Sequence, residues 1–127
     1  MHERINAIIS AIRTHLGTGD RPLGLEDFYR ICQIDNIIVE EISSARSFIL
    51  KPSAAGGGAT VIGLSRQAKG RDRCFQMFHE LGHYFCDHAR CSPEEEAEAD
   101  LFATLATGHS IAKPGLAQKP VKIFFAN

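Results

Sequence analysis

Two histidines and a glutamate at fixed spacing form the most informative pattern in the sequence, His79-Glu80-Leu81-Gly82-His83. If this stretch is helical, His79 and His83 lie one turn apart on the same face, so both imidazoles can reach a single metal ion. Glu80 lies beside them, where its carboxylate can hydrogen-bond a water molecule on the metal without binding the metal itself. The pattern therefore predicts a Zn²⁺ site with Glu80 as the catalytic base. The alternative is a pair of surface histidines that has this spacing by chance.

The residues around this pattern, from about Asp72 to His88, have the periodicity of an amphipathic helix. The apolar face carries Cys74, Met77, Phe78, Leu81 and Phe85, and the polar face carries Gln76, His79, Glu80, His83 and Asp87. We expect the apolar face to pack in the core and the polar face to line a cleft. Gly82 is unfavourable inside a helix by about 1 kcal/mol relative to alanine, so we expect a neighbouring segment to approach closely there.

A second helix is predicted from Pro93 to about Thr107. Ser92 is a favourable N-cap, Pro93 suits the first helical position, and Glu95 is placed to complete a capping box. Gly108 follows as the residue that ends the helix. A short loop therefore connects this helix to the one that carries the two histidines.

Glu96 and Asp100 lie one turn apart on this second helix and share a face. Zinc sites of hydrolases commonly use three protein ligands and leave one position open, and Glu96 is the candidate for the third ligand. Asp100 is placed to accept the remaining N–H of a ligand histidine, which would fix the tautomer of that ring. Glu94, Glu95 and Glu96 also read as an acidic first turn that complements the helix dipole, and we favour that explanation for Glu94 and Glu95.

Together the two motifs resemble those of the ImmA/IrrE-type zinc metallopeptidases, whose hallmark is H-E-L-G-H followed by E-x-x-A-(N/D)-x-F-A. The matching residues are His79-Glu80-Leu81-Gly82-His83-Tyr84 and Glu96-Ala97-Glu98-Ala99-Asp100-Leu101-Phe102-Ala103. The resemblance covers roughly residues 25–107 and implies that His79, His83 and Glu96 bind zinc and that Glu80 is the base. One departure lies at the end of the second helix, where the family has an apolar L-L-x-P and this chain has Leu105-Ala106-Thr107-Gly108.

The resemblance also implies a substrate, because members of this family act on helix-turn-helix repressors of mobile elements or stress regulons. We therefore expect an endopeptidase that cleaves one intracellular protein, a DNA-binding repressor. The alternative is a non-catalytic zinc-binding module that regulates or binds a partner. Both alternatives predict zinc, and only the enzyme needs Glu80.

The composition is that of an ordinary globular protein, with 127 residues, 44% hydrophobic and 23% charged, and a net charge of −1. This charge gives no field that favours direct binding of nucleic acid or of a membrane. The sequence shows neither an apolar run of about 18 residues nor a signal peptide, so we expect a cytoplasmic protein. Its four cysteines should then be thiols. The oligomeric state does not follow from the sequence.

The pattern along the chain predicts a single α+β domain, a small zincin-like (gluzincin-like) metallopeptidase fold. Helices are expected from His2 to Leu16 and from Leu25 to Cys32, followed by strands at 36–42, 47–51 and 59–65. We expect these strands to form a short three-stranded, mostly antiparallel sheet. Residues 1–24 would be an N-terminal helix and loop, 25–107 the family core, and 108–127 an irregular tail.

Two functions remain to be assigned, substrate binding and stabilisation of the oxyanion. An extended substrate is expected to add to the edge of the sheet along the third strand, through Ala59, Thr60, Val61, Ile62 and Gly63; the alternative is an edge strand that binds nothing. The candidates for the oxyanion are His109, Tyr84 and His88, with His109 the first to test. Cys86, His88 and Cys91 could also contribute to a second metal site, although buried thiols are the favoured explanation.

Overall fold

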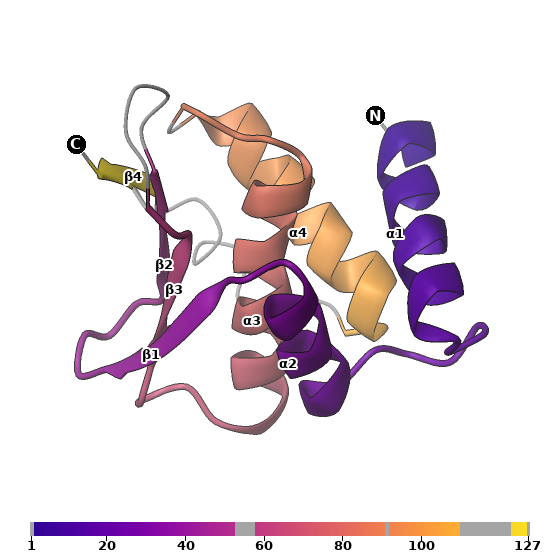
Figure 1. Cartoon of the computed structure of the whole chain (residues 1–127), viewed down its shortest axis with the longest axis horizontal. Helices are drawn as coiled ribbons and strands as arrows, with labels where there is room; N and C mark the ends of the chain where they lie inside the picture. Colours follow the sequence, from indigo (N-terminus) through magenta and orange to yellow (C-terminus); the bar gives the residue numbers. More distant parts are fainter. Residues whose placement is uncertain (1, 53–57, 91, 110–122, 127) are drawn as a thin grey trace.

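The computed structural model describes residues 2–52, 58–90, 92–109 and 123–126. Its elements, in chain order, are α1 (His2–Leu16), α2 (Leu25–Ile34), β1 (Ile38–Ile42), β2 (Phe48–Pro52), β3 (Val61–Ser65), α3 (Gly70–Phe85), α4 (Pro93–Thr107) and β4 (Ile123–Ala126). Helix α3 lies between the sheet and α4, and α1 packs on α4 (Figure 1). This arrangement confirms the predicted α+β class.

The sheet differs from the prediction in strand number and direction. Four strands are arranged in the order β1-β3-β2-β4, with β1 parallel to β3, β3 antiparallel to β2, and β2 parallel to β4. The three predicted strands are present close to their expected positions, but a fourth strand joins them and only one of the three pairings is antiparallel, so the expectation of a mostly antiparallel sheet was wrong. Side-chain alternation reveals the two faces of a strand but neither its direction nor its neighbours. Strand β4 also lies within the tail that was expected to be irregular, of which residues 110–122 and 127 are outside the described part.

Strand β3 occupies the interior of the sheet and not its edge. Val61 pairs with Ile38 of β1 on one side and with Leu50 of β2 on the other, and Gly63 is likewise paired on both sides. The backbone groups of this strand are therefore already used within the sheet. The prediction that Ala59–Gly63 binds substrate by strand addition was wrong, because the order of strands along the chain does not give their order in the sheet.

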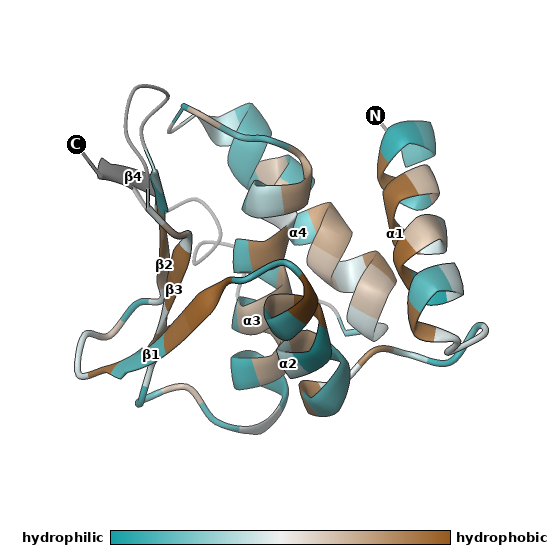
Figure 2. Cartoon of the chain, viewed as in Figure 1, coloured by the Kyte–Doolittle hydropathy of each residue, from teal (hydrophilic) through white to brown (hydrophobic). Residues whose placement is uncertain are grey.

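The hydrophobic core lies where the helices meet one another and the sheet. Helix α1 turns one apolar stripe towards α4 (Figure 2), which matches the predicted helical spacing. The core is built from Ile5, Ile9, Ile12 and Leu16 of α1, Ile49, Ile62 and Leu64 of the sheet, Met77, Phe78 and Leu81 of α3, and Phe102, Ala103 and Ala106 of α4. Burial of these side chains supplies most of the driving force that holds the helices in place.

Helix α3 ends at Phe85, three residues before the predicted end, because the chain turns sharply at Asp87. Asp87 has a φ of 57°, in the left-handed region that aspartate adopts more readily than most residues. The amide of His88 donates to the carbonyl oxygen of His83 at 3.0 Å, and the amide of Asp87 donates to that of Tyr84 at 3.2 Å. These two bonds form a Schellman turn, which brings His88 back over the end of the helix.

Lys51 of β2 connects the sheet to the same end of α3. Its Nζ donates to the carbonyl oxygen of His83 at 2.9 Å and to that of His88 at 2.7 Å. Burial lowers the pKa of this ammonium, although nearby acidic groups oppose the shift. A cation at the carboxyl end of a helix also interacts favourably with the helix dipole.

Gly82 is the point of closest approach between α3 and α4. A β-carbon at this position would lie 3.0 Å from Ala99 Cα, 3.0 Å from Phe102 Cβ and 3.2 Å from the carbonyl oxygen of Ala99. These contacts are tighter than nearly all real β-carbon contacts, and two of them are to backbone atoms that cannot rotate away. The expectation that a neighbouring segment approaches at Gly82 is confirmed, and the segment is α4.

Gly82→Ala should lower the free energy of unfolding by about 1–2 kcal/mol. Overpacking a tight contact costs about 1–3 kcal/mol, which exceeds the gain of about 1 kcal/mol in helix propensity. Denaturant unfolding would measure the change. Gly24→Ala is the matched control, because its φ is −131° and nothing lies within 4 Å of an added β-carbon. A more stable Gly82→Ala variant would contradict the close approach of α3 and α4.

Candidate metal centre

Three predicted ligands come together where α3 packs against the first turn of α4. His79 Nε2 and His83 Nε2 lie 3.2 Å apart. Glu96 Oε1 is 3.3 Å from His79 Nε2, and Glu96 Oε2 is 2.7 Å from His83 Nε2. The two histidines are neighbours because they are one turn apart on α3, and Glu96 reaches them because Gly82 lets α4 approach.

The spacing of these atoms fits a tetrahedral metal site. Two ligand atoms bonded to one zinc ion at 2.0–2.2 Å are separated by about 3.3 Å. The distances of 3.2 and 3.3 Å match this value, while the 2.7 Å contact from His83 to the second carboxylate oxygen is shorter. Two imidazole nitrogens and one carboxylate are also a donor set that zinc prefers. The residues therefore fit a divalent metal ion.

Asp100 fixes the orientation of the His79 ring. Asp100 Oδ1 lies 2.7 Å from His79 Nδ1. A carboxylate can only accept, so His79 carries its proton on Nδ1 and directs the lone pair of Nε2 towards His83 and Glu96. The hydrogen bond expected from the one-turn spacing of Glu96 and Asp100 is present.

The centre is buried, and its charge states suit a metal. The exposed fractions are 2% for His79, 1% for Glu80, 0% for His83 and 8% for Glu96, so the face of α3 expected to line a cleft is covered. Burial lowers the pKa of His83 to about 4, which leaves this ring neutral at neutral pH. Burial alone would raise the pKa of Glu96, but its interaction with the adjacent imidazoles of His79 and His83 holds this pKa well below its ordinary value. Neutral imidazole and ionised carboxylate are the forms that bind metals.

Glu95 acts at the helix start, as expected for an acidic first turn. The amide of Glu95 donates to Ser92 Oγ at 3.1 Å, which is the predicted N-cap interaction. Its carboxylate accepts from the amide of Ala89 at 3.2 Å and from that of Arg90 at 2.8 Å, so it also orders the preceding loop. Glu94 is exposed. Of the three consecutive glutamates, only Glu96 joins the histidines.

Two of the three oxyanion candidates, Tyr84 and His88, already have hydrogen-bond partners in the structure. The Tyr84 hydroxyl hydrogen-bonds Asp35, and burial together with this bond raises its pKa to about 12. His88 lies behind His83, with its ring nitrogens at 2.9 Å from His83 Nδ1 and 2.6 Å from Glu98 Oε1. His109 follows the end of α4, whose last residue, Thr107, lies about 16 Å from Glu96 by the rise of the helix. These contacts argue against Tyr84 and His88 as oxyanion donors, and the role of His109 stays a prediction.

Two residues near the centre were missed by the sequence analysis, Lys51 and Glu98. Lys51 lies two residues after the buried Ile49 and so shares its face of β2, and a charged residue at this inward-facing position was the available signal. Glu98 belongs to an acidic run and carries no signal that separates it from solvent-exposed neighbours. Its role depends on His88, which only the turn at Asp87 places beside it.

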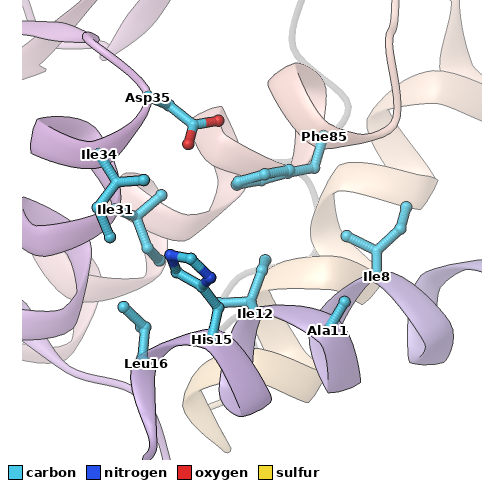
Figure 3. A pocket seen from close by; sticks show the side chains of 9 residues that line it. All are labelled: Ile8, Ala11, Ile12, His15, Leu16, Ile31, Ile34, Asp35 and Phe85. Carbon is cyan, nitrogen blue, oxygen red and sulfur yellow. The ribbon is translucent and has the colours of Figure 1, made fainter.

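A separate pocket of about 330 Å³ lies between α1, α2 and the end of α3 (Figure 3). It is lined mainly by apolar side chains, including Ile8, Ile12, Ile31, Ile34 and Phe85, with His15 and Asp35 contributing polar groups. None of its lining residues belongs to the metal centre. This pocket is therefore not the place where a substrate would meet the predicted ligands.

In the part of the chain that the structure describes, no helix combines the length and apolar character needed to cross a membrane.

Comparison with protein families gives a match of residues 40–109 to Peptidase_M78, described as the IrrE N-terminal-like domain. The match covers just over half of the 127 residues and includes all three candidate ligands. Neither the curated proteins nor the solved structures give a significant match. The family agrees with the small zincin-like domain predicted from the sequence.

Glu96→Gln should weaken metal binding by more than about 10-fold, because loss of even an outer hydrogen-bond partner of a ligand has that effect. Zinc affinity measured by competition with a chelator would test this. Glu94→Gln and Glu95→Gln are controls that should retain zinc affinity: the first changes only helix-end electrostatics, by about 0.3–1 kcal/mol, and the second also weakens two hydrogen bonds to the loop before α4. Equal losses of affinity in all three variants would show that Glu96 is not a ligand.

Proposed function

Because this chain belongs to the Peptidase_M78 family of IrrE N-terminal-like domains, we propose that it is a zinc-dependent endopeptidase. His79, His83 and Glu96 hold the metal in this proposal, and Glu80 is the catalytic base. The observation that carries it is the convergence of two imidazole nitrogens and one carboxylate at distances that suit a single ion. The position of Glu80, directly after the first ligand on α3, adds a base on the same helix.

The chemistry divides between the metal and the chain. A bound zinc ion would polarise a peptide carbonyl and make a nearby water molecule more acidic. Glu80 accepts a proton from water as the water oxygen bonds to the carbonyl carbon. Glu80 then gives this proton to the amide nitrogen as the carbon–nitrogen bond breaks, which yields a carboxylic acid and an amine. Asp100 keeps His79 in the tautomer that binds metal.

The proposed substrate is a cytoplasmic DNA-binding repressor of the helix-turn-helix class, one that controls a mobile element or a stress regulon. The support for this part is the resemblance of the two motifs to the ImmA/IrrE-type metallopeptidases. Strand β3 is excluded as the docking strand, since both of its edges are paired. An extended substrate segment that adds to the sheet would pair with β1 or β4, which are its outer strands.

The burial of the centre favours a second candidate function, a non-catalytic zinc-binding module. Glu80 is 1% exposed, so a substrate carbonyl cannot reach it without a change in the surrounding structure. A metal held in such a place stabilises the folded state whether or not catalysis occurs. The two functions differ in whether Glu80 is needed for anything beyond packing.

Glu80→Gln should retain zinc and lower the rate of repressor cleavage by at least about 100-fold, because a general base contributes about 10²–10⁴-fold. The assay would follow processing of a co-expressed repressor and, separately, its capture by the variant, which should persist. Glu94→Gln makes the same chemical change at an exposed site and should leave cleavage unaffected. Cleavage by Glu80→Gln at the wild-type rate, or capture by the wild type without any cleavage, would favour the non-catalytic module.

A further inference from the structure

We propose that His88 and Glu98 form a hydrogen-bonded relay behind His83 that holds this ring in the tautomer and orientation of a metal ligand. His83 Nδ1 lies 2.9 Å from His88 Nδ1, and His88 Nε2 lies 2.6 Å from Glu98 Oε1. His83 and His88 are buried, and the Glu98 side chain is 19% exposed. This inference rests on the proposed metal site and assigns positioning roles to two residues outside it.

The direction of each hydrogen bond follows from the carboxylate at the end of the relay. Glu98 can only accept when ionised, so His88 donates through Nε2–H. In the proposed relay, His88 keeps a lone pair on Nδ1 and accepts the Nδ1–H of His83. His83 is left with its lone pair on Nε2, the atom that lies 3.2 Å from His79 Nε2 and 2.7 Å from Glu96 Oε2. The relay therefore selects the tautomer that the metal centre requires.

The fold supplies each member of the relay from a different place. The Schellman turn at Asp87 returns His88 to the end of α3, and Lys51 holds the carbonyl oxygens of both histidines. Glu98 comes from α4, two residues after Glu96. Residues two apart on a helix do not share a face, so Glu98 does not point where Glu96 points. His88 spans the separation between this carboxylate and His83.

The relay completes a pattern in which each ligand histidine has an outer carboxylate from α4. His79 contacts Asp100 directly at 2.7 Å, whereas His83 reaches Glu98 through a second imidazole. Outer partners of this kind raise the basicity of a ligand and restrict the rotation of its ring. Arg4 of α1 places a positive charge beside Glu98, the last member of the relay. Its Nη1 lies 3.8 Å from Glu98 Oε1, and its Nη2 donates to the carbonyl oxygen of Cys86.

A second metal site is the main competing explanation, because ligand atoms of Cys86, His88 and Glu98 lie within 4.8 Å of one another. Charge argues against it, because the Arg4 guanidinium lies 3.8 Å from the Glu98 carboxylate that would bind the ion. Cys91, once considered for this site, lies outside the described residues.

Two substitutions of His88 separate the relay from simple packing. His88→Phe keeps the ring volume and removes the acceptor, while His88→Asn loses volume and can place an amide oxygen near the position of Nδ1. The relay predicts zinc affinity about 10–100-fold lower in His88→Phe, with a smaller loss in His88→Asn. A packing role predicts the opposite order, since asparagine leaves a void. Unfolding measured on the metal-free variants reports their folding separately from their affinity.

The tautomer of His83 gives a direct second readout. Two-bond nitrogen–proton correlations in the NMR spectrum of the wild type should show His83 protonated on Nδ1 in both metal-free and zinc-loaded protein, and His88 protonated on Nε2. In His88→Phe the preference of metal-free His83 for Nδ1–H should disappear. A wild-type His83 protonated on Nε2 in the metal-free protein, or a His88→Phe variant with unchanged zinc affinity, would overturn the relay.

Metal stoichiometry completes the test and keeps it distinct from the proposed function. One zinc ion per wild-type chain supports the relay, whereas two ions, with one lost in Cys86→Ser, would overturn it in favour of the second metal site. A wild type that binds no zinc would refute the zinc peptidase, and the tautomers of its metal-free form would still decide the relay. Normal zinc binding with unaffected His88 variants would refute the relay alone.

Discussion

The close approach of α3 and α4 at Gly82 is the constraint on which the rest of the structure depends. The two candidate histidine ligands come from α3 and the carboxylates beside them from α4, so the candidate centre forms only if the helices meet at this distance. Glycine removes the side chain that would keep them apart. The sheet packs on α3 and α1 packs on α4, so the helix pair is held from two sides (Figure 1).

Gathering so many polar groups in a small interior is costly unless each has a defined partner. A buried polar group left unsatisfied costs about 1–3 kcal/mol, and a buried charge costs more. In the described part of the chain, α4 supplies carboxylates to the two ligand rings, one directly through Asp100 and one through His88 and Glu98. The same bonds that offset the cost of burial also set the tautomers. One set of interactions thus stabilises the fold and sets the geometry of the candidate metal centre.

The sequence predicted most reliably what local signals control. Helices α1 and α4 have the predicted bounds, because amphipathic spacing and the Ser92–Pro93 start signal act within a few residues. The three candidate ligands and Asp100, which helical spacing and the two motifs singled out, lie together in the structure. Strand order was not predictable in this way, since pairing of β1 with β3 joins segments more than 20 residues apart. The turn at Asp87 was not predicted either, because a single left-handed residue does not change the hydrophobic pattern. The positions of His88 and Glu98 relative to His83 depend on that turn.

Lys51 has a consequence for the folding of the sheet. Successive side chains on a strand point to opposite faces, so a slip of β2 by one residue would move this ammonium to the outer face. The carbonyl oxygens of His83 and His88 would then lose their donor, and the Lys51 ammonium would lose both of these acceptors. Apolar residues such as Ile49 and Leu50 can exchange places at modest cost, but a lysine with two fixed acceptors cannot. The two hydrogen bonds of Lys51 to the end of α3 therefore favour the observed register of β2 over a register shifted by one residue.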